Sequence, residues 1–255
     1  MERTIDLNCD MGEGFGSWGM GDDAAMLDIV TSANIACGFH AGDPVIMTDT
    51  ARMAREKGVR IGAHPGFNDL WGFGRRAIRG DTPQDLERMV AYQVGALQAC
   101  AALAGHSLGH VKAHGALYNV AAVDPDVAAA IARAVRTVDS GMVLVAPPSS
   151  ALERAGIDTG LRVAREAFAD RSYEDDGTLT PRTVRGSVIH DATVAAERVV
   201  RMLLEGCVES RSGRPVPILV DTICVHGDNP GAVAMARTVR DALEAAGITV
   251  APFTG

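Results

Sequence analysis

The segment Asp6-Leu-Asn-Cys-Asp10 alternates polar and apolar side chains and then runs into a glycine-rich loop. Successive residues of a strand point to opposite faces, so Asp6, Asn8 and Asp10 share one face of a strand predicted over Thr4–Cys9. Polar side chains at the end of a strand are typical of a site at the carboxyl edge of a parallel sheet. This segment therefore predicts a strand that leads into a functional site.

The same pattern recurs along the chain. Five further predicted strands run into polar residues of catalytic type, in the segments 32–40, 61–64, 110–114, 166–170 and 224–228. An open doubly wound sheet would gather its functional residues at one switch point, whereas an α/β barrel gathers them from many strand ends. The distribution over six strands therefore favours a closed barrel.

Strand-like and helix-like segments alternate through the chain. An Asp or Thr followed by Pro marks a helix start, and this signal predicts three helices, over 43–57, 82–103 and 124–138. Further helices are expected over 22–29, 149–155, 191–205 and 229–246, and further strands over 30–39, 59–63, 109–113, 142–146, 161–168, 218–225 and 249–252. We expect loops over 169–185 and 210–217, the first of them functional. The result is a TIM-barrel-like (β/α) barrel of seven or eight units, in one domain over residues 1–255.

Composition and charge exclude several classes of protein. A net charge of −8 argues against a nucleic-acid-binding surface, which would need a basic patch. The charged residues Glu2 and Arg3 argue against a signal peptide, and the most apolar stretch, 90–104, is too short to span a membrane. The five cysteines are odd in number and widely spaced, which indicates reduced thiols and predicts a cytoplasmic protein.

The loop after the first strand contains a G-x-G-x-x-G pattern at Gly14, Gly16 and Gly19. A dinucleotide-binding fingerprint also needs a helix directly after the loop and an acidic residue ending the second strand, which here ends in His40. The amides of this loop, with that of Gly12, are candidates for binding an anion such as a phosphate. The alternative is that the glycines only permit a tight turn.

Carboxylates and imidazoles at the first three strand ends are the candidates for acid–base chemistry. Asp10 is a candidate general base or metal ligand, although Asp also serves well as a loop cap. Glu13 is a second candidate, because a Glu between glycines is not placed there for packing. His40 and His64 lie in loops flanked by Gly and Pro and suit proton transfer or metal binding, with a structural role as the alternative.

The strand 109–113 places His110, Lys112 and His114 on one face. A partly desolvated lysine beside imidazoles can stabilise an oxyanion or a phosphoryl group, and the alternative is a lysine–carboxylate pair in the barrel mouth. With Asp10 and Asp228 the histidines could assemble a divalent-metal site. No compact ligand spacing of the H-x-x-E-H kind supports such a site, so the sequence does not predict a resident metal.

Arginines in loops beyond two of the strands can form paired hydrogen bonds with a carboxylate or phosphate. Arg75 and Arg76 follow Gly72-Phe-Gly74, with surface solvation as the alternative for Arg76. Arg171 follows Asp170, with which it can alternatively form a local ion pair. The remaining polar residues at strand positions complete the predicted binding set: Asn8, Asn34, Glu166, Asp170 and His226. The chain has neither a G-x-S-x-G elbow nor a Walker loop, so serine-hydrolase and P-loop mechanisms are not supported.

Taken in order, these segments resemble the LamB/YcsF family, the A subunits of 5-oxoprolinase. The matching segments are 6–16, 32–44, 61–66, 72–76, 110–119 and 166–173, and 225–228 extends the match to nearly the full chain. The family usually reads Val-Lys-Pro-His-Gly where this chain has Ala113 between Lys112 and His114. We expect a slightly softer strand end from this change and no loss of activity.

The resemblance implies a barrel of the glycoside hydrolase/deacetylase type and the ATP-dependent hydrolytic opening of 5-oxo-L-proline to L-glutamate. It also implies ATP as co-substrate, with Mg²⁺ expected, and two partner subunits, B and C. In the mechanism that we expect, the lactam oxygen is phosphorylated and water then attacks the ring carbon. Asp10, helped by His40 or His64, is the base, Lys112 and His114 stabilise the oxyanion or phosphate, and the glycine loop 12–16 or Arg76 holds the anionic end.

Two rival interpretations remain open at this stage. The superfamily and the histidines and aspartates suggest a metal-assisted carbohydrate deacetylase, and a subunit that only binds a small acid is the non-catalytic alternative. The density of titratable groups at strand ends argues against the second. The sequence leaves open whether the chain forms a homo-oligomer.

Overall fold

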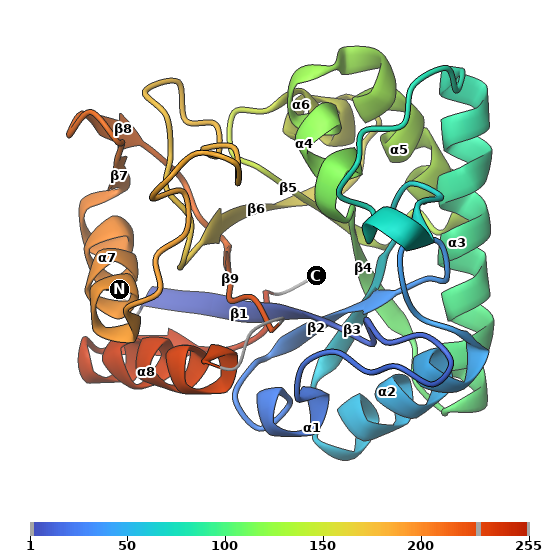
Figure 1. Ribbon diagram of the computed structural model, residues 1–255, viewed down its shortest axis with the longest axis horizontal. Helices are drawn as coiled ribbons and strands as arrows, with labels where there is room; N and C mark the ends of the chain where they lie inside the picture. Colours follow the sequence, from blue (N-terminus) through green and yellow to red (C-terminus); the bar gives the residue numbers. More distant parts are fainter. Residues whose placement is uncertain (1–2, 228–230, 254–255) are drawn as a thin grey trace.

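The computed structural model describes residues 3–227 and 231–253, and a closed barrel of parallel strands forms its centre (Figure 1). Around the barrel the strands follow one another as β1 (Arg3–Met11), β2 (Ser32–Ala36), β3 (Arg60–His64), β4 (Leu108–Lys112), β5 (Val143–Ala146), β6 (Arg162–Phe168) and β9 (Thr222–Cys224). The last of these pairs with both β6 and β1, which closes the ring. The predicted TIM-barrel-like architecture is confirmed.

Helices surround this barrel on the outside (Figure 1). They include α2 (Pro44–Glu56), α3 (Pro83–Leu103), α5 (Pro125–Val138), α6 (Ala151–Asp158), α7 (Ala192–Glu205) and α8 (Ala232–Ala245). Three of them begin as predicted, because the side chains of Asp43, Thr82 and Asp124 accept hydrogen bonds from first-turn amides and a proline follows each cap. The short helix α1 (Asp23–Met26) and the 3-10 turn η1 (Leu70–Gly72) lie in loops.

Several boundaries differ from the sequence prediction. Helix α4 (Gly115–Val123) was not predicted, because its N-cap His114 makes no capping hydrogen bond that a motif could reveal. The segment expected as a plain loop over 210–217 contributes to an antiparallel hairpin of β7 (Cys207–Glu209) and β8 (Pro215–Pro217). The strand expected over 218–225 is only three residues long. Short pieces of this kind carry too few residues for a periodic signal.

The barrel interior contains polar side chains where most barrels have branched apolar ones. Asp6 lies deepest, where it accepts hydrogen bonds from the hydroxyls of Thr31, Ser32 and Thr222. Burial raises the pKa of this carboxyl group. An apolar group of Val143, Val145 and Ala164, with Phe253 packed against it, fills another part of the interior. Polar residues therefore extend through the barrel toward the strand ends.

The chain enters this interior after its last strand. Strand β10 (Ile248–Val250) pairs with the start of β1, and Phe253 then packs edge-on against His110, with ring centroids 5.4 Å apart. All five cysteines are free thiols, as predicted, and Cys9, Cys37 and Cys224 are buried in the core. Among the described residues, every helix is either too short or too polar to cross a membrane.

Candidate active site

A cavity of about 690 Å³ lies at the carboxyl ends of the barrel strands. Its walls include Asp10 at the end of β1, His64 at the end of β3, Lys112 at the end of β4 and Phe168 at the end of β6. A volume of this size is typical of small-molecule sites. Of the residues predicted from the sequence, those that line it are Asp10, Glu13, His64, Lys112, His114, Glu166, Arg171 and His226.

Lys112 connects two carboxylates in the cavity wall. Its Nζ lies 3.0 Å from Asp10 Oδ1 and 2.8 Å from Glu166 Oε1, and the lysine side chain is only 3% exposed. Burial alone would lower the pKa of Lys112, but the neighbouring carboxylates, Asp10 foremost, outweigh it and hold the pKa well above its usual value. The ammonium group is therefore a fixed positive charge at the cavity.

A layer of hydrogen-bonded side chains in the barrel supports these carboxylates, formed by Asn8, Asn34 and His110. Asn34 Nδ2 donates to Asn8 Oδ1 at 2.7 Å and to Asp10 Oδ1 at 2.9 Å, and Asn8 Nδ2 donates to Glu166 Oε1 at 3.1 Å. His110 Nε2 donates to Asn34 Oδ1 at 2.8 Å, and burial lowers the pKa of this histidine to about 3, so the ring is neutral. Both asparagines lie outside the cavity wall, where they position the carboxylates, and their direct binding of a ligand stays a prediction.

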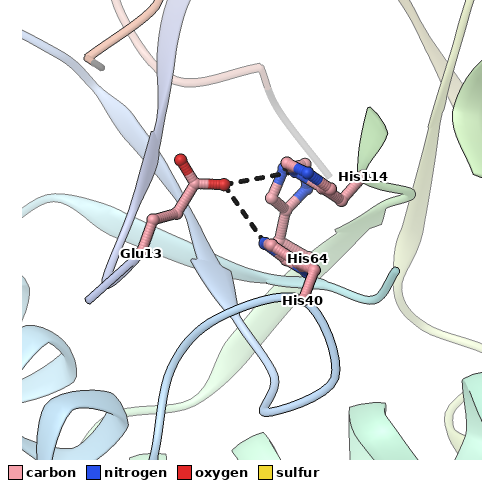
Figure 2. A group of neighbouring side chains, drawn as sticks. All are labelled: Glu13, His40, His64 and His114. Atoms are coloured by element: carbon pink, nitrogen blue, oxygen red, sulfur yellow. Dashed lines mark hydrogen bonds and ion pairs between the residues drawn. The ribbon is translucent and has the colours of Figure 1, made fainter. Parts of the chain in front are cut away.

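Glu13, His40, His64 and His114 gather from four successive β–α connections into one cluster (Figure 2). Glu13 Oε1 lies 3.1 Å from His40 Nε2 and 3.2 Å from His114 Nδ1, and His114 Nδ1 lies 3.0 Å from His64 Nε2. The rings of His40 and His114 stack with their centroids 3.6 Å apart. His64 Nε2 also lies 3.2 Å from Asp10 Oδ2, which joins this cluster to the lysine network.

The charge states of this cluster follow from its burial and its hydrogen bonds. Burial opposes ionisation of Glu13, but hydrogen bonds from His114 and His40 prevail and hold the pKa of the carboxyl group far below its usual value. Burial lowers the pKa of His40 to about 3, so this ring is neutral. For Asp10, burial is again outweighed, here by the charges of His64 and Lys112, and the pKa lies well below its usual value.

His40 is fully buried behind His114 and does not line the cavity. The close packing of His40 against His114 depends on two glycines. A Cβ at Gly66 would lie 2.8 Å from His40 Nδ1, and one at Gly74 would lie 2.7 Å from both histidines. In this structure His40 contacts the cavity residues Glu13 and His114 from behind, and its catalytic role stays a prediction.

The long loop after β6 forms another wall of the cavity. His226 Nδ1 lies 2.7 Å from the Asp170 carboxylate, which replaces the predicted Asp170–Arg171 ion pair. Arg171 instead donates to the backbone carbonyls of Thr180 and Ser187 and so fixes this loop. The guanidinium group of Arg171 is thereby committed to the protein. Asp228, the other candidate in this region, lies outside the described residues.

Two backbone amides of the glycine loop donate hydrogen bonds to side chains of the protein itself. The Gly12 amide donates to Asp23 Oδ2 and the Gly16 amide to Asp43 Oδ2, each at 2.8 Å, while the Gly14 carbonyl accepts from Gly42. None of these three glycines lines the cavity. In this structure the amides of Gly12 and Gly16 are taken up within the protein, and the positive φ of both residues fits the tight-turn alternative, so an anion-binding role of the loop stays a prediction.

Arg76 also lies away from the cavity, where it forms an ion pair with Asp69 and leaves 60% of its side chain exposed. The neighbouring Arg75 lines the cavity instead, with its guanidinium 5.0 Å from the centre of the Phe73 ring. Of the two arginines that the sequence singles out after Gly74, Arg75 is thus the one in the cavity wall, whereas sequence reasoning missed Tyr118 and Arg182 there. Tyr118 could have been found from the sequence, because it lies in the segment 110–119 that carries the family resemblance.

The sequence model of the LamB/YcsF family matches residues 5–255. The chain belongs to the LamB/YcsF family. It is 59% identical over 251 residues to a protein of Rhodopseudomonas palustris named as the A subunit of 5-oxoprolinase, covering 98% of this chain and 99% of the relative. It is 56% identical over 252 residues to the protein of the same name from Gluconobacter oxydans, covering 99% of each.

Solved structures support the fold of this LamB/YcsF member. The "Lactam Utilization Protein" from Thermus thermophilus superposes with a TM-score of 0.93 at 46% identity, covering 98% of this chain and 100% of that one. A putative cellobiose-phosphate cleavage protein from Enterococcus faecalis has a TM-score of 0.53 at 12% identity, with 99% and 98% of the chains covered. The second likeness shows a shared barrel fold alone.

Proposed function

We propose that this protein is the A subunit of a 5-oxoprolinase and takes part in the ATP-dependent hydrolytic opening of 5-oxo-L-proline to L-glutamate. The observation that carries the proposal is the buried Lys112 ammonium held between Asp10 and Glu166 in the cavity wall. A lactam is an amide, and its opening requires stabilisation of negative charge on oxygen together with activation of water. The names of the family relatives point to the same substrate class.

The chemistry begins with phosphorylation of the lactam oxygen by ATP, which releases ADP and makes the ring carbon electrophilic. Water then adds to that carbon, and collapse of the adduct breaks the C–N bond and leaves an acyl phosphate. A second water hydrolyses the acyl phosphate to glutamate and inorganic phosphate. The hydrolysis of ATP thus drives the opening of a stable amide.

The cavity residues fit distinct parts of this sequence. Asp10 is ionised and faces the cavity with 14% of its side chain exposed, so it suits the role of base, with His64 at 3.2 Å to pass on the proton. The fixed charge of Lys112 and the imidazole of His114 would stabilise the oxyanion or the phosphate. Arg75, in place of Arg76, would hold the substrate carboxylate.

The nucleotide and the partners form the remainder of the proposal. The cavity is larger than a five-membered lactam needs, and the spare volume would admit the phosphate of ATP with Mg²⁺. Because the relatives are named as one component of a larger enzyme, we propose further subunits, B and C, which complete or supply this site.

The test is glutamate release from 5-oxo-L-proline with ATP and Mg²⁺, measured for this protein alone and together with its partner subunits. We expect glutamate only when the partners and ATP are both present. Asp10→Asn should lower kcat by at least ~100-fold, since removal of a positioned general base costs about that much. Arg75→Gln should raise KM, whereas Arg76→Gln, which alters an arginine outside the cavity, should leave turnover unchanged.

Two outcomes would contradict the proposal. Full turnover by a folded Asp10→Asn variant in the complex would exclude Asp10 as the base. Absence of glutamate in every condition, with all subunits folded, would exclude the reaction itself, and deacetylation of acetylated sugars would then be the assay to perform.

A further inference from the structure

We propose that Glu13, His40, His64 and His114 bind one divalent transition-metal ion, with Zn²⁺ the best match. This site goes beyond the proposed function, which requires Mg²⁺ only as the partner of ATP. A metal ion on His64 Nε2 would take the place of the proton relay through that nitrogen, with Asp10 still the base. The site also differs from the expectation drawn from sequence spacing, because the four ligands come from four separate connections.

The ligand atoms are already close together. One atom from each of the four residues lies within 4.8 Å of all the others, and all four residues are buried (Figure 2). Bonds of about 2.1 Å in a tetrahedral site place ligand atoms about 3.4 Å apart. The pairs at 3.0–3.2 Å already match this spacing, and the widest pair needs to close by at most ~1.4 Å. Imidazole nitrogens with one carboxylate oxygen are typical ligands of zinc and of its neighbours in the first transition row.

Backbone carbonyls fix the orientation of two of the rings. His64 Nδ1 lies 2.7 Å from the Lys112 carbonyl oxygen, and His114 Nε2 lies 2.9 Å from the Phe73 carbonyl oxygen. A carbonyl only accepts hydrogen bonds, so each of these nitrogens carries a hydrogen. The opposite nitrogens, His64 Nε2 and His114 Nδ1, therefore present lone pairs when the rings are neutral. Hydrogen bonds to the far nitrogen of each imidazole are also what orients metal-ligating histidines in proteins.

In the neutral rings those lone pairs meet each other and a carboxylate, so the hydrogen bond from His114 to Glu13 needs a second hydrogen on the ring, at the place that a metal ion would take. His64 Nε2 and His114 Nδ1 lie 3.0 Å apart, and Glu13 Oε1 lies 3.2 Å from His114 Nδ1. Three electron-pair donors at such distances repel one another unless a positive species lies between them. A single proton bridges one pair only, whereas a metal ion satisfies all of them together with His40 Nε2, which lies 3.1 Å from the same carboxylate oxygen.

The local charge also favours a divalent cation. The carboxylates of Asp10, Glu13 and Glu166 bring three negative charges to the joined networks, and Lys112 brings one positive charge. A divalent ion would balance the remaining two charges. Because Glu13, His64 and His114 all line the cavity, the ion would lie at the cavity wall, where a small ligand can reach it.

The experiment measures metal binding without any substrate, so its result is independent of the 5-oxoprolinase assay. Untagged protein is treated with a chelator, checked by circular dichroism, and titrated with Zn²⁺ alone by calorimetry and with Co²⁺ alone by visible absorption. We expect one equivalent of each ion, a tetrahedral or five-coordinate Co²⁺ band, and a rise in unfolding temperature of roughly 5 °C with excess Zn²⁺.

The variants assign the binding to the cluster. His114→Gln and the more conservative Glu13→Gln should each weaken Zn²⁺ binding by at least ~10-fold. His190→Gln is the matched control, because His190 is exposed and belongs to no part of the cluster, and it should bind as the unaltered protein does. Binding unchanged in a folded Glu13→Gln variant would overturn the proposal. Failure of the folded, unaltered protein to bind either ion would also overturn it and leave a shared proton between the histidines.

Discussion

At the scale of single residues, the two lysines of the chain stand in opposite environments. Lys112 is buried between two carboxylates, whereas Lys57 forms a surface ion pair with Asp28 and has 34% of its side chain exposed. Removing one partner of a buried ion pair leaves an uncompensated charge, so Lys112→Met should lower the free energy of unfolding by about 3–5 kcal/mol. Lys57→Met should lower it by less than ~1 kcal/mol.

Urea unfolding of both variants measures this difference. Adding Glu166→Gln to Lys112→Met should restore part of the lost stability, because it removes one of the two carboxylates left unpaired. Equal losses for the two lysines would contradict the buried ion pair as the source of stability.

The orientation of strand residues in the site was predictable from the sequence, whereas loop residues such as Glu13 and His114 could be named as candidates but not oriented. Asp10, His64 and Lys112 follow from the alternation of a strand and from the position of active sites in barrels. The sequence singles out Arg75 and Arg76 together, but it could not predict that Arg75 is the one that faces the cavity, because no periodic rule sets which way a loop side chain points. The clustering of Glu13 with three histidines could not be predicted either, because it depends on the conformation of loops.

At the scale of elements, one glycine controls how strands β3 and β4 pack side chains into the barrel. Gly62 pairs with His110, and a Cβ at this position would collide with the imidazole ring. Gly62→Ala should therefore lower the free energy of unfolding by about 2 kcal/mol through overpacking. Gly95→Ala is the control: a Cβ there meets nothing within 4 Å in helix α3, so this change should stabilise the protein by roughly 0.5–1 kcal/mol.

A double-mutant cycle in urea separates the collision from other effects. In a His110→Ala background the cost of Gly62→Ala should fall close to zero, because the ring that obstructs the new methyl group is gone. A cost that persists undiminished in that background would show that strain in β3 itself, and not the imidazole, is responsible.

Elements with a local signal were predicted, and elements defined by distant contacts were not. The capping residues Asp43, Thr82 and Asp124, each followed by proline, predict the starts of their helices from a few residues of sequence. Helix α4 and the β7–β8 hairpin carry no such signal. They form through packing and pairing with parts of the chain that the local sequence does not identify.

At the scale of the whole molecule, the barrel separates a functional end from a structural end. The prediction of a barrel rested on polar residues at many strand ends, but its closure through the three-residue strand β9 could not be derived from so short a segment. The cavity lies at the carboxyl ends of the strands, and Phe253 packs in the interior against Val143, Val145 and His110. In barrels of this kind the carboxyl end serves function and the opposite end serves stability.

This division predicts the effect of removing the phenyl ring that packs inside the barrel. Phe253 is partly buried, so Phe253→Ala should lower the free energy of unfolding by about 1–3 kcal/mol, less than a fully buried phenylalanine would cost. Turnover in the assembled enzyme should change by less than ~2-fold, because Phe253 does not line the cavity and packs against His110, which does not line it either. Urea unfolding and glutamate release under identical conditions measure both quantities. A variant that keeps its stability but loses turnover would place Phe253 in the functional half of the barrel and refute the separation of the two ends.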